Sequence, residues 1–504
     1  MKKFLALLFT GSVLFCTAQK KTDPAVFGNS IRAENLSKDL YIVAGKVFEG
    51  RETATAGQRK AAAYIENVFK TLGLQPGNGS SFQLPYPVFQ DSLISTQLFI
   101  NGDSFDLYKD YDLSIGNNYS ASYGCNEIVF AGYGISDSLY DDYKGLNVQG
   151  KIVLLKNGYP NGFVQHQIDK RKFNPYSKQD AAQQHGAIAI LIIQPDFPHT
   201  PTGRKGNMYQ NVYRSQIRPL TVTISENIAR SIMGSDYDLV KNDSFKAKPF
   251  TKNVWLSLNK ETEFLQSCDV LGYLEGTDLK DQFLVISAHY DHLGKRDTVI
   301  YYGADDDGSG TVSLLELAAA FSKAKAAGKG PRRSILFLAN SGEEKGLWGS
   351  AFYTGHPVYP LEKTTADLNI DMIGRRDPGR KQGDSNNYVY VVGDDKLSSE
   401  LHPLSVAMNK KYTRLELDYK FNDPSDPLRI YYRSDHFNFA KMGVPVIFYF
   451  DGIHHDYHKP TDTADKINYD LLEKRARLVF YTAWEMANRN DMLKRDLPSV
   501  TGER

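Results

Sequence analysis

Several histidines and carboxylates in this 504-residue chain directly follow short apolar runs. His289 and Asp291 come after the apolar stretch 283–288, and positions 305–307 are three aspartates between glycines. Carboxylates this close repel one another, and a bound cation would offset the repulsion. A ligand set of histidine with Asp and Glu suits zinc best, with manganese or cobalt as substitutes. The pattern therefore indicates a metal site, although the acidic loop taken alone is equally typical of a solvated turn that begins a helix.

Two further apolar runs, at 334–339 and 443–450, and a third expected strand that ends at 368–370 are followed by similar residues. The residues of ligand type that follow them are Glu343, Glu344, Asp371 and His458. In an open α/β sheet, ligands bind beyond the carboxyl ends of the strands. Because four strand ends share this chemistry, a metal site is favoured over a series of solvated turns.

The motifs in these segments resemble those of the two-zinc aminopeptidases of peptidase family M28. In chain order they are H-Y-D, G-A-D-D-D-G-S-G, S-G-E-E-K-G-L-W-G-S, N-I-D-M-I-G, R-S-D-H and H-K-P-T-D-T. The resemblance covers most of residues 263–488. It implies an α/β fold, with a mixed-sheet zinc-peptidase (phosphorylase/hydrolase-like) domain sandwiched by helices.

The resemblance also implies a role for each site residue. The implied ligands are His289 and Asp371 for one zinc ion, Glu344 and His458 for a second, and Asp305 as the bridge between them. Glu343 is implied as the general base, which takes a proton from water and returns it to the leaving amine. A cis peptide bond is implied between Asp305 and Asp306.

Three other residues are expected to support the site. Asp291 is placed to accept the second imidazole N–H of His289. Tyr431, with Tyr432 beside it, matches a family position that supports the oxyanion, and Asp435 is expected to support the ligands or to face the substrate. Four histidines near the motifs are not assigned to metal: His292, His436, His454 and His455.

The order of the patterns predicts an interrupted peptidase domain. Residues 33–74 read as helical and resemble the start of that domain, and short β-rich runs between 128 and 224 resemble the protease-associated (PA) domain. We expect a signal peptide at 1–18, the N-terminal part of the peptidase domain at 19–113, a β-rich PA-like insert at 114–251, the catalytic domain at 252–495 and a loose tail at 496–504.

Composition excludes some function classes. With 60 basic and 59 acidic residues, the chain offers no basic face for nucleic acid. The apolar run near the N-terminus is too short to span a bilayer and is typical of an export signal, with a lipoprotein signal at Cys16 as the alternative. Outside it we expect no transmembrane span. Cys125 and Cys268 either pair or stay free, and the oligomeric state is left open.

These observations predict an exported, periplasmic or secreted zinc aminopeptidase that acts on peptides. The alternatives are a carboxypeptidase or dipeptidase of the same family, a glutaminyl cyclase-like enzyme, and a non-catalytic receptor-like binding protein. Aromatic residues near 431–437 and 457 favour an apolar first residue in the substrate. Arg429 and Arg433 favour an acidic one instead, because a guanidinium binds a carboxylate in a bidentate manner.

Overall fold

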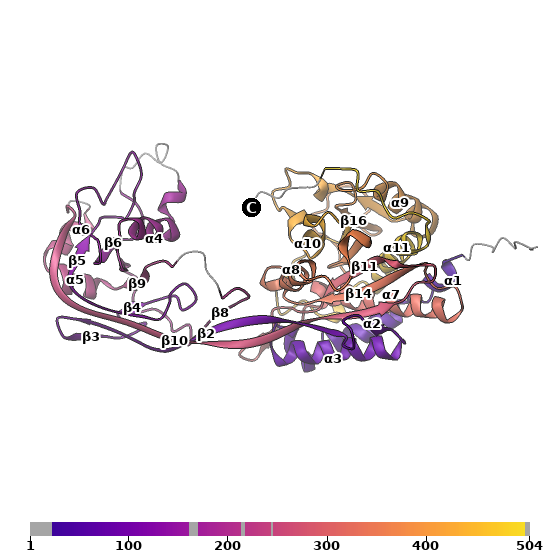
Figure 1. The fold of residues 1–504 in the computed structure, drawn as a ribbon, viewed down its shortest axis with the longest axis horizontal. Coiled ribbons are helices and arrows are strands. Elements are labelled where there is room, and N and C mark those ends of the chain that lie inside the picture. The colour runs from indigo at the N-terminus through magenta and orange to yellow at the C-terminus, as the bar shows by residue number, and fades with distance from the viewer. Residues whose placement is uncertain (1–22, 161–169, 213–216, 243–244, 499–504) are drawn as a thin grey trace, which may run out of the picture. The chain divides into compact units, whose positions relative to one another are not determined.

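The computed structural model describes residues 23–160, 170–212, 217–242 and 245–498. The predicted signal peptide and most of the predicted tail lie outside these ranges. Two compact units are formed: the described residues up to Pro85 together with those from Ser267 onward, and Tyr86–Gln266. The long strands β2 (Gln83–Ile100) and β10 (Lys248–Leu274) each continue from one unit into the other (Figure 1).

The first unit is built on a mixed sheet, as predicted. Its strand order is β17 (Glu416–Asp418), β16 (Tyr388–Val392), β18 (Val446–Phe450), β15 (Thr364–Ile370), β11 (Leu279–His289), β14 (Arg333–Asn340) and the C-terminal part of β10. Strands β18, β15, β11 and β14 are parallel, whereas β16 and β10 run antiparallel to their neighbours β18 and β14. The parallel strands therefore end together at one edge of the sheet.

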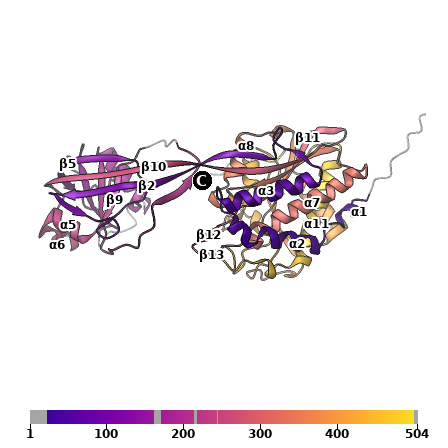
Figure 2. The same cartoon turned by 90° about the horizontal axis from the view of Figure 1, so that it is seen from below.

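Helices cover both faces of this sheet. One face packs against α2 (Ala33–Val43), α3 (Ala56–Thr71), α7 (Gly310–Ala326) and α11 (Tyr469–Asn488), three of which lie side by side in Figure 2. The other face packs against α8 (Trp348–Gly355) and α10 (His436–Lys441). Because both faces are covered, the parallel part of each central strand is buried along its length, including polar residues such as Asp367 and Asn369 of β15.

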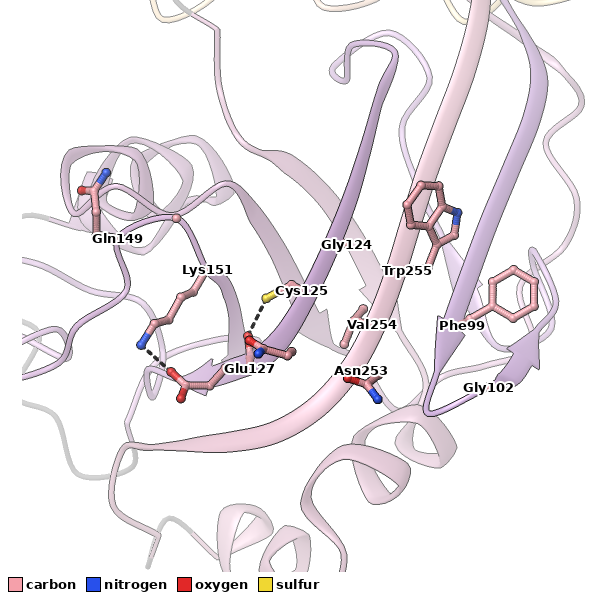
Figure 3. A pocket seen from close by; sticks show the side chains of 12 residues that line it. Phe99, Gly102, Gly124, Cys125, Glu127, Gln149, Lys151, Asn253, Val254 and Trp255 are labelled. Carbon is pink, nitrogen blue, oxygen red and sulfur yellow. Dashed lines mark hydrogen bonds and ion pairs between the residues drawn. The ribbon is translucent and has the colours of Figure 1, made fainter.

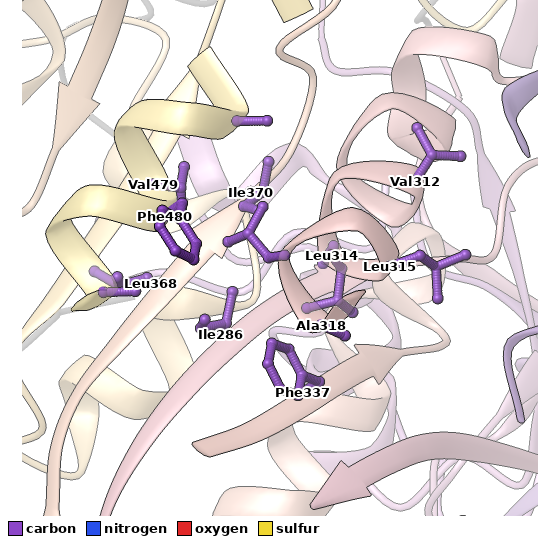
Figure 4. Close-up of a cluster of buried hydrophobic side chains, with 14 of the residues drawn as sticks. Ile286, Val312, Leu314, Leu315, Ala318, Phe337, Leu368, Ile370, Val479 and Phe480 are labelled. Atoms are coloured by element: carbon purple, nitrogen blue, oxygen red, sulfur yellow. The ribbon is translucent and has the colours of Figure 1, made fainter. Parts of the chain in front are cut away.

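Strand β11 shows how the core is divided. Leu284 and Ile286 contribute to the cluster under α7 and α11, whereas Val285 contributes to the cluster on the opposite face. Figure 4 shows Ile286 among Leu314 of α7, Phe480 of α11 and residues of β14 and β15. Burying one such side chain contributes about 1.5–3 kcal/mol, so β11 is a stiff support for the residues at its end.

The helical segment predicted at 33–74 is divided into two helices. Between α2 and α3 the chain forms the short 3-10 segment Lys46–Arg51, in which Gly50 has a φ of 72°. The Thr55 side chain then accepts a hydrogen bond from the Gln58 amide and begins α3. This break brings Arg51 and Thr53 into the buried interior, where both contact the site described below.

The second unit contains the strands predicted for the PA-like insert. Its sheet order is the N-terminal part of β10, β5 (Ala121–Phe130), β6 (Ile152–Lys156), β7 (Ala189–Ile193), β9 (Leu220–Ile224) and β4 (Tyr111–Asp112). Helices α4 (Pro175–Gln184), α5 (Glu226–Met233) and α6 (Asp236–Lys241) accompany it. No helix among the described residues of the chain is long and apolar enough to cross a membrane. Cys125 and Cys268 are both free.

Candidate metal centre

The parallel strands bring the predicted site residues together at one edge of the first sheet. His289 is the last residue of β11 and pairs in register with Asn340, the last residue of β14. Glu343 and Glu344 follow β14 in a single 3-10 turn, and Asp371 directly follows β15. Since neighbouring parallel strands end at the same level, side chains far apart in sequence become neighbours here.

The central carboxylate of this cluster is Asp306. Its Oδ1 lies 3.3 Å from Nε2 of His289, and its Oδ2 lies 3.1 Å from Nε2 of His458. The same His458 nitrogen lies 3.1 Å from Oε2 of Glu344, and His289 Nε2 lies 3.6 Å from Oδ1 of Asp371. One carboxylate thus separates a His289–Asp371 pair from a His458–Glu344 pair.

Asp305, the predicted bridge, lies elsewhere in the site. Its Oδ1 accepts a hydrogen bond from the Gly374 amide at 2.7 Å, and its Oδ2 lies 3.2 Å from Nε2 of His454. The cis peptide bond was also predicted one residue too early, because the structure has it between Asp306 and Asp307. Three identical residues in a row give the sequence no means of fixing this register.

Tertiary contacts fix the register instead. Oδ2 of Asp462, in the H-K-P-T-D-T motif, accepts hydrogen bonds from the amides of Asp305 and Asp306 at 3.0 and 3.2 Å. Oδ1 of Asp307 accepts from the amides of Gly310 and Met372 at 2.8 and 3.0 Å. Two of the three aspartates are therefore held by backbone amides, and Asp306 faces the histidines.

Ligand-type atoms form two groups in this cluster. Atoms of His289, Asp307 and Asp371 lie within 4.8 Å of one another, as do atoms of His292, Asp306 and Glu344. Several of these atoms are buried without a hydrogen-bond partner among the described residues, namely His289 Nε2, Asp306 Oδ2, Asp307 Oδ2 and Glu344 Oε1. An unpaired buried polar atom costs about 1–3 kcal/mol, so a shared cation fits the cluster, and the nitrogen and oxygen donors suit zinc.

The carboxylates also shift the protonation of their neighbours. Burial lowers the pKa of His289, but the carboxylates of Asp371 and Glu343 outweigh it and raise this pKa well above its ordinary value. Burial raises the pKa of Glu343 well above its ordinary value. The acidic cluster therefore draws a proton onto His289, and a metal ion bound there must displace that proton.

Asp291 joins the histidine to the predicted base. Its main-chain carbonyl lies 3.1 Å from Nδ1 of His289, and its carboxylate Oδ1 lies 3.6 Å from the same nitrogen. Oδ1 accepts a hydrogen bond from the Glu343 amide at 3.2 Å, and Oδ2 accepts one from the Thr53 hydroxyl at 2.7 Å. Thr53 lies in the N-terminal segment, and no sequence signal pointed to this contact.

A small cavity opens beside Asp306, Glu343 and Asp371. The apolar part of its wall consists of Met372, Ile430, Phe448, Phe450 and Ile453, and three carboxylates form much of the rest. Arg433 also lines it and donates a hydrogen bond to the Tyr457 hydroxyl at 3.1 Å. A substrate entering the cavity would therefore meet apolar side chains beside the carboxylates and one guanidinium.

The structure buries two other predicted residues away from this cavity wall. Tyr431 packs in the core against His436 and Phe437, and its hydroxyl has no hydrogen-bond partner among the described residues. Asp435 is fully buried and accepts a hydrogen bond from Ser350. Burial raises the pKa of Asp435 to about 7.

The second unit has a larger open cavity, of about 830 Å³ (Figure 3). Trp255 and Phe99 lie on one side of it, and the ion pair of Lys151 with Glu127 lies on the other. Cys125 donates its thiol hydrogen to the Glu127 carbonyl oxygen at 2.8 Å. No group of metal-ligand residues was found among the described residues of this unit, so the candidate centre is in the first unit.

Two parts of the chain match known families. Residues 269–483 match the model of peptidase family M28, and residues 113–229 match that of the PA domain. The chain therefore contains an M28 peptidase region and, between the two parts of the first unit, a PA-domain region.

Individual relatives are distant. A glutamate carboxypeptidase 2 homolog of Caenorhabditis elegans is 23% identical over 430 residues, which are 70% of this chain and 53% of the relative. A probable leucine aminopeptidase of Arthroderma otae is 30% identical over 217 residues, which are 42% of this chain and 56% of the relative. The chain thus spans about half the length of these curated relatives.

Two solved structures share the fold over most of their length. The aminopeptidase from Aneurinibacillus sp. strain AM-1 aligns with a TM-score of 0.55 at 20% identity, covering 93% of this chain and 97% of that one. A zinc aminopeptidase from Bacillus subtilis aligns with a TM-score of 0.51 at 19% identity, covering 94% and 99%. At this identity the likeness establishes the α/β architecture.

Proposed function

We propose that this protein is an exported two-zinc exopeptidase that removes N-terminal residues from peptides. The observation that supports it best is the position of Asp306, whose two carboxylate oxygens lie 3.3 Å from His289 and 3.1 Å from His458. A carboxylate placed between two histidine-containing groups is suited to bridge two cations at the separation that hydrolytic two-metal sites use.

The proposed ligands are His289 and Asp371 for one ion, Glu344 and His458 for the other, and Asp306 as the bridge. Zinc bound there would supply Lewis-acid activation of the attacking water and of the scissile carbonyl. The carboxylates of Asp307 and Asp462 accept hydrogen bonds from backbone amides and so hold the loop in place. Asp306 is therefore positioned by its neighbours before any ion binds.

Glu343 is the proposed general base. It precedes the ligand Glu344, and its amide is held by Asp291, so its main chain is fixed while its carboxylate faces the cavity. Burial raises its pKa well above the ordinary value, which makes it a stronger base than an exposed glutamate. It would take the proton from the attacking water and return it to the leaving amine.

The cavity supports an apolar first residue in the substrate. Met372, Phe448, Phe450 and Ile453 provide apolar contacts for such a side chain, and the Arg433 guanidinium already donates a hydrogen bond to the Tyr457 hydroxyl. Arg433 favours the second candidate function, a carboxypeptidase or dipeptidase for acidic substrates, because a guanidinium at the cavity binds a carboxylate well. Export is proposed from the basic and apolar start of the sequence, and fractionation of cells that express the full chain tests it.

The decisive experiment measures hydrolysis of leucine and glutamate anilides, and of a peptide with a free or an acetylated N-terminus. We expect a higher kcat/KM for the leucine anilide, no cleavage of the acetylated peptide, loss of activity with chelator and recovery with zinc. Preference for the glutamate anilide that disappears in Arg433→Ala would favour the acidic-substrate candidate. Cleavage of the acetylated peptide from its C-terminus would contradict the aminopeptidase assignment.

A further inference from the structure

His292 is buried against the candidate centre but has no part in the ligand set proposed above. Its imidazole is fully buried, and neither ring nitrogen has a hydrogen-bond partner among the described residues. A buried polar ring without partners costs about 1–3 kcal/mol for each unpaired group. A metal ion beside the ring would provide a partner for one of these nitrogens.

The nearest acceptors belong to the second ligand group. Nδ1 of His292 lies 2.8 Å from Oε1 of Glu344 and 3.9 Å from Oδ2 of Asp306. The two atoms are close enough for a hydrogen bond, yet both are among the buried atoms that have none within the described residues. Two ligands of one cation show this arrangement, because each directs its lone pair at the ion and not at the other ligand.

The His458 ring completes the same group. Its Nε2 lies 3.1 Å from Oε2 of Glu344 and 3.1 Å from Oδ2 of Asp306. The rings of His292 and His458 are 6.0 Å apart at an angle of 66°. The two imidazoles thus approach the Glu344 carboxylate, one at each oxygen, and both lie near Oδ2 of Asp306. Imidazole nitrogens and carboxylate oxygens are a donor set typical of zinc.

The backbone is shaped to accept the His292 ring. Gly303 has a φ of 55°, and a Cβ added there would lie 2.4 Å from Cγ of His292. The His292 amide donates to the Arg51 carbonyl at 3.3 Å, and residues 52 and 292 form a β-bridge. The backbone of His292 is therefore held by residues 51 and 52. The absence of a side chain at Gly303 leaves space for the imidazole ring.

We propose that His292 is a ligand of the metal ion held by Glu344 and His458, so that this ion has two imidazole ligands. The proposal rests on the proposed function, because it adds a ligand to the same centre. It distinguishes the two ions chemically: one would be held by a single histidine and carboxylates, and the other by two histidines with Glu344 and the bridge.

The test compares the wild-type protein with His292→Ala, with His455→Ala as the control. His455 is exposed and belongs to neither ligand group. X-ray absorption of the zinc-loaded protein counts imidazoles, and we expect three for every two ions in wild type and two for every two ions in His292→Ala. Chelator competition should show one ion bound about tenfold or more weakly in His292→Ala. His455→Ala should match wild type in both measurements.

Parallel titrations of Glu344→Gln and Asp371→Asn identify which ion is weakened, and the melting temperatures of the metal-free variants check that they fold. Two imidazoles for every two ions in wild type would overturn the proposal. A loss of affinity in His292→Ala without a change in imidazole count would also overturn it, since His292 would then act by orienting Glu344. A wild-type protein that binds no zinc would instead contradict the proposed function itself.

Discussion

The backbone amide of Glu343 donates a hydrogen bond to the carboxylate of Asp291 at 3.2 Å. Asp291 lies two residues after His289 and Glu343 lies one residue before Glu344, so this bond joins the two strand ends that carry the proposed ligands of different ions. The position of the proposed base is therefore coupled to both halves of the centre.

Replacing Glu343 with glutamine should lower kcat about 10³-fold while leaving the bound zinc unchanged, because the base is lost and the ligands remain. Steady-state kinetics and elemental analysis of the same sample measure both quantities. Glu362→Gln, a change at an exposed glutamate, serves as the control and should behave as wild type. Loss of zinc in Glu343→Gln would reassign Glu343 as a ligand.

Asp306→Asn should lower the affinity for both ions, because it weakens the oxygen atoms that face His289 and His458. Asp305→Asn should retain both ions, since an amide oxygen can still accept the hydrogen bond from Gly374. Chelator competition measures the zinc affinity of each variant and so shows which of the two aspartates binds the ions. The opposite pattern, with both ions retained in Asp306→Asn and lost in Asp305→Asn, would restore the register predicted from the sequence.

Arg51→Lys should destabilise the peptidase unit by about 3 kcal/mol or more and weaken zinc binding. The guanidinium donates to the carbonyls of Tyr290 at 2.7 Å and of Tyr302 and Gly303 at 2.8 Å, so it ties the end of β11 to the loop before the aspartates. A lysine cannot reach all of these acceptors, and each buried carbonyl left unpaired costs about 1–3 kcal/mol.

Denaturant unfolding and zinc titration test this expectation. The exposed Arg59 provides the matched Arg59→Lys control, which should change neither quantity. Equal stability of Arg51→Lys and wild type would show that the loop is held by other contacts.

Stability should fall as the pH rises through about 6, because of Asp394. Burial raises the pKa of this carboxyl to about 6, with His402 opposing the shift. A raised pKa means that the folded protein keeps the proton longer than the unfolded chain, so this group's contribution is complete below about pH 4 and is lost by about pH 7. The loss is at most about 3 kcal/mol.

Melting temperatures of metal-free protein between pH 4 and 7 measure this effect. In Asp394→Asn the difference between the melting temperatures at pH 4 and pH 7 should be smaller than in wild type. Asp395→Asn, at the exposed neighbouring position, should keep the wild-type dependence on pH. An unchanged profile in Asp394→Asn would assign the pH dependence to other groups.

The sequence by itself determined the strand ends at which the site residues lie. These strand ends could be predicted because a buried strand is rich in apolar residues and polar residues begin where it ends. The polar residues that follow the strands are His289, Glu343, Glu344 and Asp371. The fold class and the PA-like strands followed from similar patterns and motifs, and the structure and family matches confirm both.

The tertiary structure alone decided which aspartate of 305–307 faces the histidines, because Asp462, Gly374 and Met372, all distant in sequence, fix the loop. It also decided that residues 33–74 break into two helices, which brings Arg51 and Thr53 to the site, and that His292 points into the cluster. These features depend on side-chain directions and on contacts between remote segments. A local pattern records which residues are buried, but it does not record which atoms they meet.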